Sequence, residues 1–241
     1  MKSLKNFLFL LAAVPVLAFA SEAGPHLDKA PVNLADQDSL QRGARMFVNY
    51  CLNCHSASAM RYSRMQDLGL TEEQIKDNLL FATDKPGETM KVGMAKADGK
   101  AWFGATPPDL SVVARSRGSD WLYTYLRSFY RDDTRATGWN NVVFDKVGMP
   151  HVMWSLQGEM VPVYKKHGEH EVLDHLELAK PGSVTLAEYD AQVGDLVNYL
   201  TWMGEPAQLQ RKQLGLIVLA FLAVFFVVAY YLKKEFWKDI H

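Results

Sequence analysis

The sequence predicts a mainly α-helical domain, with loop insertions and one small β-hairpin, followed by a single transmembrane helix. Amphipathic stripes over residues 38–50 and 185–204 indicate two helices that each bury one face. A run without charges, from Leu214 to Leu232, is long enough to cross a bilayer. The two amphipathic helices are expected to pack across each other, because each must bury its apolar face against another element.

The N-terminal segment, residues 1–20, is typical of a secretory signal peptide. Two lysines precede an apolar stretch over residues 7–17, and residues 18–20 read Ala-Phe-Ala, the small-residue pattern of a cleavage site. An uncleaved anchor helix is the alternative, but Pro15 and the shortness of the apolar stretch favour cleavage. We therefore predict a mature chain that starts at Ser21, outside the cytoplasm.

The apolar run near the C-terminus predicts a membrane anchor over residues 213–232. At ~1.5 Å per residue it spans roughly 28 Å, close to the thickness of the hydrocarbon core. A buried core helix is the alternative, which the lack of charge disfavours. With the signal peptide, the anchor predicts a single-pass protein of a bacterial inner membrane. The domain over residues 21–212 then lies in the periplasm and the tail over 233–241 in the cytoplasm.

Shorter helices, loops and a hairpin are expected between these two ends. Capping boxes begin two of the helices, at Thr71 with Gln74 and at Thr185 with Glu188. The patterns predict helices over 38–50, 71–81, 109–117, 119–130 and 185–204, loops over 84–108 and 131–160, and a hairpin within 160–178.

The balance of charge excludes one large class of partner. The chain has 26 basic and 27 acidic residues and a formal net charge of −1, without a run of Lys or Arg in the domain. Proteins that bind nucleic acid carry a basic patch or stripe that neutralises phosphates. We therefore expect no nucleic-acid partner.

The most informative motif is CLNCH, which holds the only two cysteines of the sequence, Cys51 and Cys54, with His55 directly after them. Cys-x-x-Cys-His is the attachment motif of haem c, in which two thiols bond to the porphyrin and the histidine binds the iron. A redox dithiol is expected at a helix N-terminus after a strand, whereas this motif follows a predicted helix. A zinc site lacks further cysteines, and a plain disulfide leaves the histidine without a role. The motif therefore predicts one covalently attached haem c.

The iron of such a haem needs a sixth ligand or an open position. A methionine thioether suits electron transfer, because it raises the reduction potential. Met149 is the preferred candidate, since Gly148 and Pro150 hold it in a non-helical segment far along the chain from the attachment motif. Met153 and His151 are the alternatives, and each of the three could also be packing.

Several motifs together resemble the cytochrome c1 family, the haem c subunits of ubiquinol–cytochrome c reductase. These are YCLNCHS, PPDLSVVARSRG, VGMPH and a single C-terminal membrane helix with a basic tail. The resemblance covers roughly residues 30–240. It implies a cytochrome c-like fold in which Cys51 and Cys54 form thioethers to the haem. It also implies that His55 and Met149 ligate the iron.

The resemblance also implies contacts at the edge of the haem. Arg115 falls where the family places a partner for a haem propionate, and a guanidinium suits that carboxylate. Arg117 is the nearby alternative. Pro108 belongs to the segment that packs by the haem edge in the family. The chain departs from the family at Trp121, where members often have a tyrosine, so a tyrosine hydrogen bond to the propionate cannot be assumed.

The function that the resemblance implies is electron transfer. The protein would take electrons from a Rieske iron–sulfur subunit and pass them to a cytochrome c. It is not an enzyme by itself, but a subunit of quinol–cytochrome c oxidoreductase. Its expected partners are the cytochrome b subunit, the Rieske subunit, a cytochrome c acceptor and membrane lipid, within a dimeric complex. The alternatives are a free-standing membrane-tethered cytochrome that serves a terminal oxidase, and a haem enzyme with an open iron.

Two further groups of residues carry weaker hypotheses. Seven acids between residues 169 and 195 could steer a basic acceptor, or could belong to an ordinary solvated face. Three histidines of the predicted hairpin, interleaved with acids, could bind a metal, although exposed histidines are usually solvated. They are His167, His170 and His175.

Overall fold

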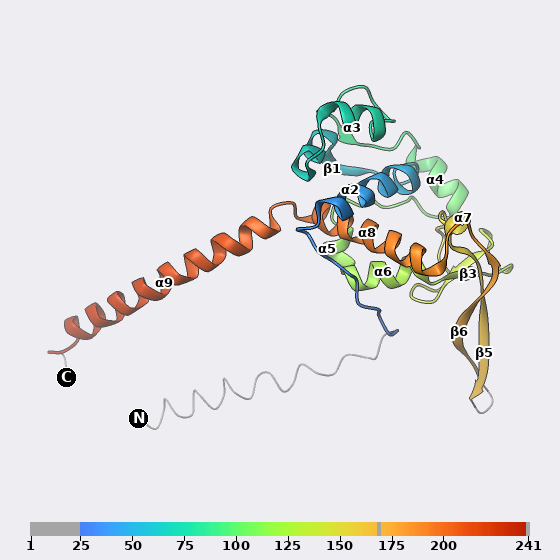
Figure 1. Ribbon diagram of the computed structural model, residues 1–241. Helices are drawn as coiled ribbons and strands as arrows, with labels where there is room; N and C mark the ends of the chain where they lie inside the picture. The colour runs from blue at the N-terminus through green and yellow to red at the C-terminus, as the bar shows by residue number, and fades with distance from the viewer. Residues whose placement is uncertain (1–24, 168–169, 240–241) are drawn as a thin grey trace.

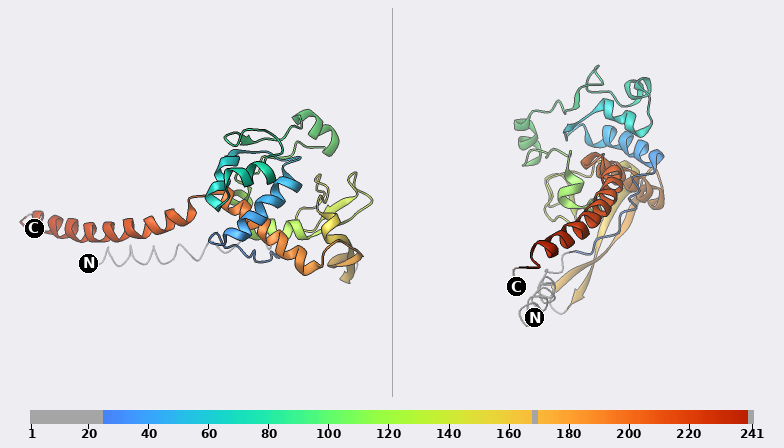
Figure 2. Two further views of the ribbon diagram at one scale, coloured as in Figure 1. Left: turned by 45° about the horizontal axis from the view of Figure 1, so that its top comes forward. Right: turned by 90° about the vertical axis from the view of Figure 1, so that its left-hand side faces the viewer.

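The fold is a set of packed helices from which two elements project, a long helix and a β-hairpin (Figure 1). A computed structural model describes residues 25–167 and 170–239. The predicted signal peptide, residues 1–20, lies outside these described residues. Helix α9 leaves the domain as a separate rod in Figure 1 and in the left view of Figure 2. About half of the chain is helical, so the predicted fold class, mainly α with a small hairpin and a C-terminal apolar helix, is confirmed.

Helices α2 (Gln37–Met46) and α8 (Leu186–Gly204) cross in the middle of the domain, as predicted. Gly43 lies at the crossing, where a β-carbon would overlap the carbonyl oxygen of Asp195. The predicted capping box of Thr185 and Glu188 begins α8. The last part of the predicted helix 38–50 differs, because a wider π-helical turn, η2 (Phe47–Cys51), leads the chain into the cysteine motif.

The remaining helices are short and lie around this pair. The predicted capping box at Thr71 is present and begins α3. The helix predicted over 119–130 ends at Arg127, because the chain then turns into a strand. These short helices are η3 (Tyr62–Leu68), α3 (Glu72–Asn78), α4 (Lys96–Phe103), α5 (Val113–Arg117), α6 (Ser119–Arg127) and α7 (Trp154–Gln157).

Three antiparallel two-stranded sheets complete the domain. The predicted hairpin is confirmed and is longer than expected, because its pairing extends from His167↔His170 to Gly158↔Pro181. The other two sheets were not predicted: their second strands lie in the segments 84–108 and 131–160, which were predicted as loops, and Phe129–Arg131 overlaps the end of the helix predicted over 119–130. The strands are β1 (Ala57–Arg61) with β2 (Thr89–Met90), β3 (Phe129–Arg131) with β4 (Trp139–Asn141), and β5 (Gly158–His167) with β6 (His170–Pro181).

The prediction of an uninterrupted loop over 84–108 was therefore wrong, since this segment holds β2 and α4. Helix α4 was missed because Gly99 lies inside it, and glycine costs about 1 kcal/mol relative to alanine within a helix. The structure shows why a glycine stands there. A β-carbon at Gly99 would lie 2.8 Å from Cδ of Pro107, so the glycine lets this helix approach the Pro-Pro segment closely.

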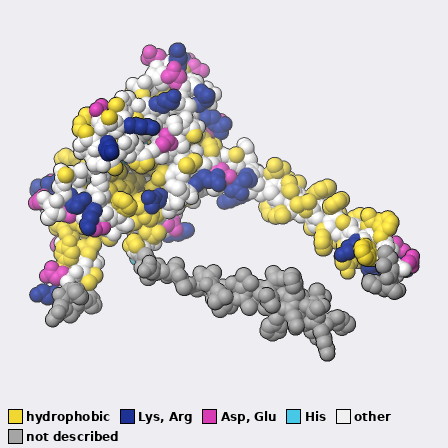
Figure 3. Space-filling model, turned by 180° about the vertical axis from the view of Figure 1, so that it is seen from behind, with side chains coloured by type: hydrophobic (Ala, Val, Ile, Leu, Met, Phe, Trp, Pro, Cys, Tyr) yellow, Lys and Arg dark blue, Asp and Glu magenta, His cyan; other side chains and the backbone are white. Residues whose placement is uncertain are grey.

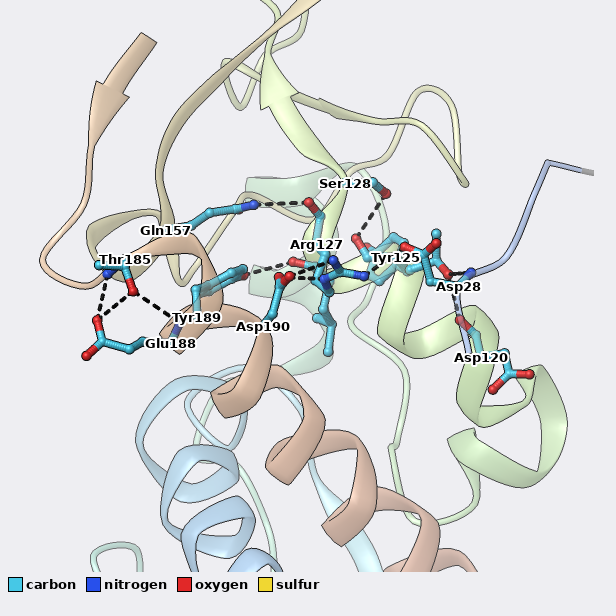
Figure 4. Close-up of polar contacts among 12 residues, drawn as sticks. Asp28, Asp120, Tyr125, Arg127, Ser128, Gln157, Thr185, Glu188, Tyr189 and Asp190 are labelled. Carbon is cyan, nitrogen blue, oxygen red and sulfur yellow. Dashed lines mark hydrogen bonds and ion pairs between the residues drawn. The ribbon is translucent and has the colours of Figure 1, made fainter. Parts of the chain in front are cut away.

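Arg127 fixes the end of α6 against α8 and the N-terminal segment. Its guanidinium donates to both carboxylate oxygens of Asp190, at 2.6 and 2.7 Å, and to Asp28 at 2.7 Å. Figure 4 shows the arginine between these two acids, with the hydroxyl of Tyr189 donating to the carbonyl oxygen of Leu126 beside it. A two-pronged arginine–carboxylate pair is geometrically specific, so it sets the position of α6 as well as its stability.

Helix α9 (Gln208–Phe236) contains the predicted membrane anchor. It is 29 residues long with a mean hydropathy of 2.6 in its most apolar window, and none of that window is buried against the domain. By length and composition it could cross a membrane. Figure 3 shows its largely hydrophobic surface, with basic side chains near both ends. The described helix is longer than the predicted anchor, 213–232, at both ends.

Candidate haem c site

Five of the six site residues predicted from the sequence line one apolar cavity, namely Cys51, Cys54, His55, Pro108 and Met149, and the sixth, Arg115, does not. The volume of the cavity is about 330 Å³, within the range of ligand pockets. The cysteine motif, the Pro-Pro segment, α6, α8 and the segment around Met149 all contribute to its wall. Among the described residues, the lining side chains used below are Cys51, Cys54, His55, Phe103, Pro108, Arg117, Trp121, Tyr125 and Met149.

The turn of the cysteine motif places Cys51 and Cys54 in the wall of this cavity. The backbone N–H groups of Cys54 and His55 both donate to the carbonyl oxygen of Cys51, at 3.1 and 2.8 Å, which closes a tight helical turn. The two thiols are not bonded to each other. Burial raises the pKa of Cys51 to about 12, and burial also raises the pKa of Cys54, so both side chains are neutral thiols near pH 7.

His55 is held by a hydrogen bond on one side of its ring. Its Nδ1–H donates to the carbonyl oxygen of Pro108 at 2.7 Å. Burial lowers the pKa of His55, and this outweighs the opposing effects of the Pro108 hydrogen bond and of Asp109. The imidazole is therefore neutral near pH 7, with Nε2 as its free lone pair. That tautomer and that orientation are what a metal-ligating histidine requires.

Asp109 clamps the Pro-Pro segment onto the chain that follows the cysteine motif. Its carboxylate accepts hydrogen bonds from the backbone N–H and the hydroxyl of Ser58, at 2.9 and 2.7 Å, and from the N–H of Ser111 at 2.9 Å. Burial alone would raise the pKa of Asp109, but these hydrogen bonds outweigh it and lower the pKa to about 2. A further bond joins Leu110 N–H to the carbonyl of Ser56 at 2.8 Å. The carbonyl of Pro108 is thereby positioned for His55.

Met149 lies in the cavity wall on the segment after β4. Gly148 lets this segment approach α4 closely, because a β-carbon there would lie 2.7 Å from the carbonyl oxygen of Phe103. The side chain of Met149 is partly buried against the core. Its sulfur accepts a hydrogen bond from the hydroxyl of Tyr125, with an O–S distance of 3.4 Å. A thioether sulfur is therefore available at the cavity.

The two alternatives to Met149 have other partners. Met153 is 1% exposed in the hydrophobic core and is not among the residues that line the cavity. His151 is 2% exposed, and its Nε2 is bonded to Oε1 of Gln157 at 2.7 Å. Its ring stacks on Phe129 with centroids 4.9 Å apart. Burial lowers the pKa of His151 to about 4, so it is a neutral core histidine.

The two arginines of the ARSR segment lie in different places. Arg115 does not line the cavity. Its guanidinium is exposed and pairs with Glu205 at 3.4 Å, near the start of α9. Arg117 lines the cavity, with its guanidinium 5.2 Å from the ring centroid of Trp121. Among the described residues, Arg117 is the one lysine or arginine in an otherwise largely apolar lining.

A match to a known family covers almost the whole described chain. Residues 28–240 match the Cytochrome C1 family. The chain belongs to the cytochrome c1 family. A cytochrome c1 of Allochromatium vinosum is 49% identical over 238 residues, covering 97% of both chains. A cytochrome c1 of Rhodospirillum rubrum is 29% identical over 265 residues, covering 96% of both. A protein named ammonia monooxygenase gamma subunit in Nitrosomonas europaea is 47% identical over 241 residues, covering 100% of both.

Membership in the cytochrome c1 family confirms the predicted cofactor. Proteins of this family carry one covalently bound haem c and are electron-transfer subunits of the cytochrome bc1 complex. The residues present fit such a group. Two unpaired thiols, an oriented imidazole and a thioether meet at one apolar cavity, whose walls also hold a guanidinium for a carboxylate. Sequence reasoning missed the roles of Tyr125 and Asp109 here, because no local pattern marks a residue that acts across the fold.

The structure also bears on the hypotheses of acceptor steering by the seven acids and of a metal site at the three hairpin histidines. Three of the seven acids are paired, Asp190 with Arg127, Asp195 with Arg42, and Asp174 with Lys165. Pairing weakens any long-range attraction from this face. The side chains of His167 and His170 lie outside the described residues, and His175 is bonded to Asp174 at 2.7 Å. Among the described residues, no group of three potential ligands could hold a metal ion.

Proposed function

We propose that this cytochrome c1 receives electrons from a Rieske iron–sulfur subunit and passes them to a cytochrome c. When bound, haem c supplies a one-electron carrier whose iron alternates between two oxidation states. The observation that carries the proposal is the cavity in which the CLNCH motif and Met149 meet. A closed pair of axial ligands suits electron transfer, whereas a haem enzyme needs an open or displaceable position.

The residues divide the work at this site. Cys51 and Cys54 would hold the haem through thioethers, and His55 and Met149 would ligate its iron. The Pro108 carbonyl orients His55, and the neutral imidazole keeps its Nε2 free to bind. The apolar walls exclude water, which limits the reorganisation that accompanies a change of charge.

Arg117 is the better candidate than Arg115 for the haem propionate. Its guanidinium lines the cavity and lies over Trp121, while Arg115 is occupied by Glu205. Arg117 is itself exposed, and its planar guanidinium, which lies over the indole at an apolar wall, can form a two-pronged pair with a carboxylate there. Trp121, where this chain departs from the family, would then position the arginine, because the guanidinium of Arg117 lies over the indole ring.

The cellular setting follows from the two ends of the chain. Residues 1–20 have the features of a signal peptide, and α9 has the length and hydropathy of one membrane span. We propose that the haem domain lies in the periplasm of a bacterial inner membrane and that the C-terminus lies in the cytoplasm. The partners would be cytochrome b, the Rieske subunit and a cytochrome c acceptor, with membrane lipid around α9, in a dimeric complex.

The test is to extract the protein with detergent under mild conditions, purify it by an affinity tag, and record a reduced-minus-oxidised spectrum with a metal count. The proposal predicts a c-type haem together with b-type haems and a two-iron cluster in the same preparation. A lone c-type haem without these partners contradicts it and favours the alternative, a free-standing tethered shuttle that serves a terminal oxidase.

A further inference from the structure

The hydroxyl of Tyr125 meets the sulfur of Met149 at the wall of the cavity. The O–S distance is 3.4 Å, and the oxygen is the donor, because a thioether can only accept. Among the described residues this is the one hydrogen bond that the hydroxyl makes. The contact joins α6 to the segment after β4, which are 24 residues apart along the chain.

The ring that carries this hydroxyl is fixed on several sides. Trp121 stacks on it with ring centroids 4.8 Å apart and planes 11° from parallel. Phe129 packs against it in an edge-to-face arrangement, with ring centroids 5.0 Å apart and planes at 67°. The backbone carbonyl of Tyr125 accepts a hydrogen bond from the amide of Asn141 at 2.8 Å. The surrounding packing thus aims the hydroxyl at the sulfur.

We infer that Tyr125 is a positioning residue that tunes the reduction potential through the sulfur of Met149. This inference rests on the proposed role of Met149 as an axial ligand. A thioether sulfur has two lone pairs, so one can bind iron while the other accepts the hydroxyl proton in a hydrogen bond. The hydrogen bond withdraws electron density from the sulfur and weakens its donation to the iron.

The direction of the effect follows from the charge on the iron. The oxidised iron carries one more positive charge and depends more on donation from its ligands than the reduced iron does. A weakened donor therefore favours the reduced state and raises the potential. Hydrogen bonds to ligand sulfur atoms are also among the factors that set the potentials of iron–sulfur clusters. The same bond also fixes the orientation of the thioether, which opposes its displacement by an added ligand.

Tyr125→Phe tests the inference, because it removes one oxygen and leaves the stacked ring in place. At a fixed ambient potential, we expect the ratio of reduced to oxidised haem to fall about threefold. At 59 mV per tenfold for one electron, that is a decrease of about 28 mV in the midpoint. The sulfur-to-iron charge-transfer band of the oxidised protein should also shift, and added imidazole should bind more readily.

Tyr189→Phe is the matched control. In the wild type the hydroxyl of Tyr189 is also buried and donates a hydrogen bond to the carbonyl of Leu126 at 2.8 Å, but Tyr189 does not line the cavity. This variant should lose stability and keep the midpoint potential and the charge-transfer band of the wild type. Equal shifts in both variants would show a general loosening of the domain and would overturn the inference.

The remaining outcomes separate this inference from the proposed ligand. If Met149→Leu loses the charge-transfer band while Tyr125→Phe keeps both the band and the potential of the wild type, Met149 remains the ligand. That result would overturn the role of Tyr125. Absence of that band in the wild type would overturn both. If Tyr125→Phe takes up no haem, a ring-fluorinated tyrosine at position 125 decides. It is a stronger donor of similar size, so the potential must rise if the inference holds, and an unchanged potential overturns it.

Discussion

The Nδ1 atom of His55 lies 2.7 Å from the carbonyl oxygen of Pro108, across 53 positions of the chain. A ring nitrogen bonded to a carbonyl must carry the proton, so the contact fixes the tautomer as well as the ring orientation. The proline is followed by an acid, Asp109, that ties its segment to the chain after the cysteine motif. The PPDLS motif therefore orients the proposed haem ligand indirectly, through one carbonyl group.

Loss of the Asp109 clamp should weaken the domain in a pH-dependent way. We expect Asp109→Asn to lower the free energy of unfolding at pH 7 by about 1 to 2 kcal/mol, since hydrogen bonds to charged groups are lost. The pKa of Asp109 is lowered from 3.8 to about 2 in the folded protein, so its contribution is present above pH 4 and disappears as the pH falls through 2. Denaturant unfolding of both proteins from pH 7 to pH 2 should therefore show curves that converge at the acid end. A constant gap at all pH values would contradict the clamp.

Met149→Leu should open the iron. The thioether is lost at nearly constant volume, so the domain should stay folded while the midpoint potential falls and reduced haem binds carbon monoxide. Met153→Leu is the control, because it makes the same change at a core methionine. The side chain of Met153 is 1% exposed and does not line the cavity. Redox titration of the two variants and the wild type checks the assignment. A wild-type spectrum in Met149→Leu, or carbon monoxide binding in Met153→Leu, would reverse the choice of ligand.

Arg117 and Arg115 allow the propionate partner to be tested by a matched pair. Removing a positive charge beside the haem stabilises its more positive, oxidised state, so Arg117→Gln should lower the midpoint potential. Arg115→Gln should leave the potential close to that of the wild type, because Arg115 pairs with Glu205 at 3.4 Å and lies outside the cavity lining. Potentiometric titration at constant ionic strength distinguishes them. A shift confined to Arg115→Gln would assign the propionate to that arginine.

Gly43→Ala should disrupt the crossing of α2 and α8. The added methyl group would overlap the backbone carbonyl of Asp195 and come close to Tyr199, and neither backbone can move without shifting a whole helix. Overpacking of this kind costs about 1 to 3 kcal/mol or more. Gly87→Ala is the control, because nothing lies within 4 Å of a β-carbon there. Thermal unfolding should separate the two variants, and equal midpoints would show that the helices are less tightly held than the structure indicates.

Much of the fold could be predicted because its signals are local. The stripes of α2 and α8, the capping boxes at Thr71 and Thr185 and the uncharged run of α9 each occur within one segment. Helix α4 and the sheet of β3 and β4 could not be predicted, because tertiary contacts decide them. Gly99 lowers the helical signal of α4 for the sake of its contact with Pro107, and β3 and β4 are too short to show an alternating pattern.

The candidate site likewise has parts that the sequence predicts and parts that only the fold reveals. The CLNCH motif predicts its own chemistry, because the two thiols and the imidazole act within five residues. The choice between Arg115 and Arg117 needed three dimensions, since the two are neighbours in sequence and point to different surroundings. Tyr125 carries no motif at all, and only the fold places its hydroxyl on the sulfur of Met149.

We propose that this haem takes its electron from quinol oxidation through the iron–sulfur subunit. Rapid mixing of the purified complex with ubiquinol, followed at the absorbance of haem c, tests it most directly when repeated on a complex that lacks the Rieske subunit. We expect fast reduction of haem c in the full complex and loss of this fast reduction without that subunit. Equally fast reduction of haem c in both preparations would contradict it.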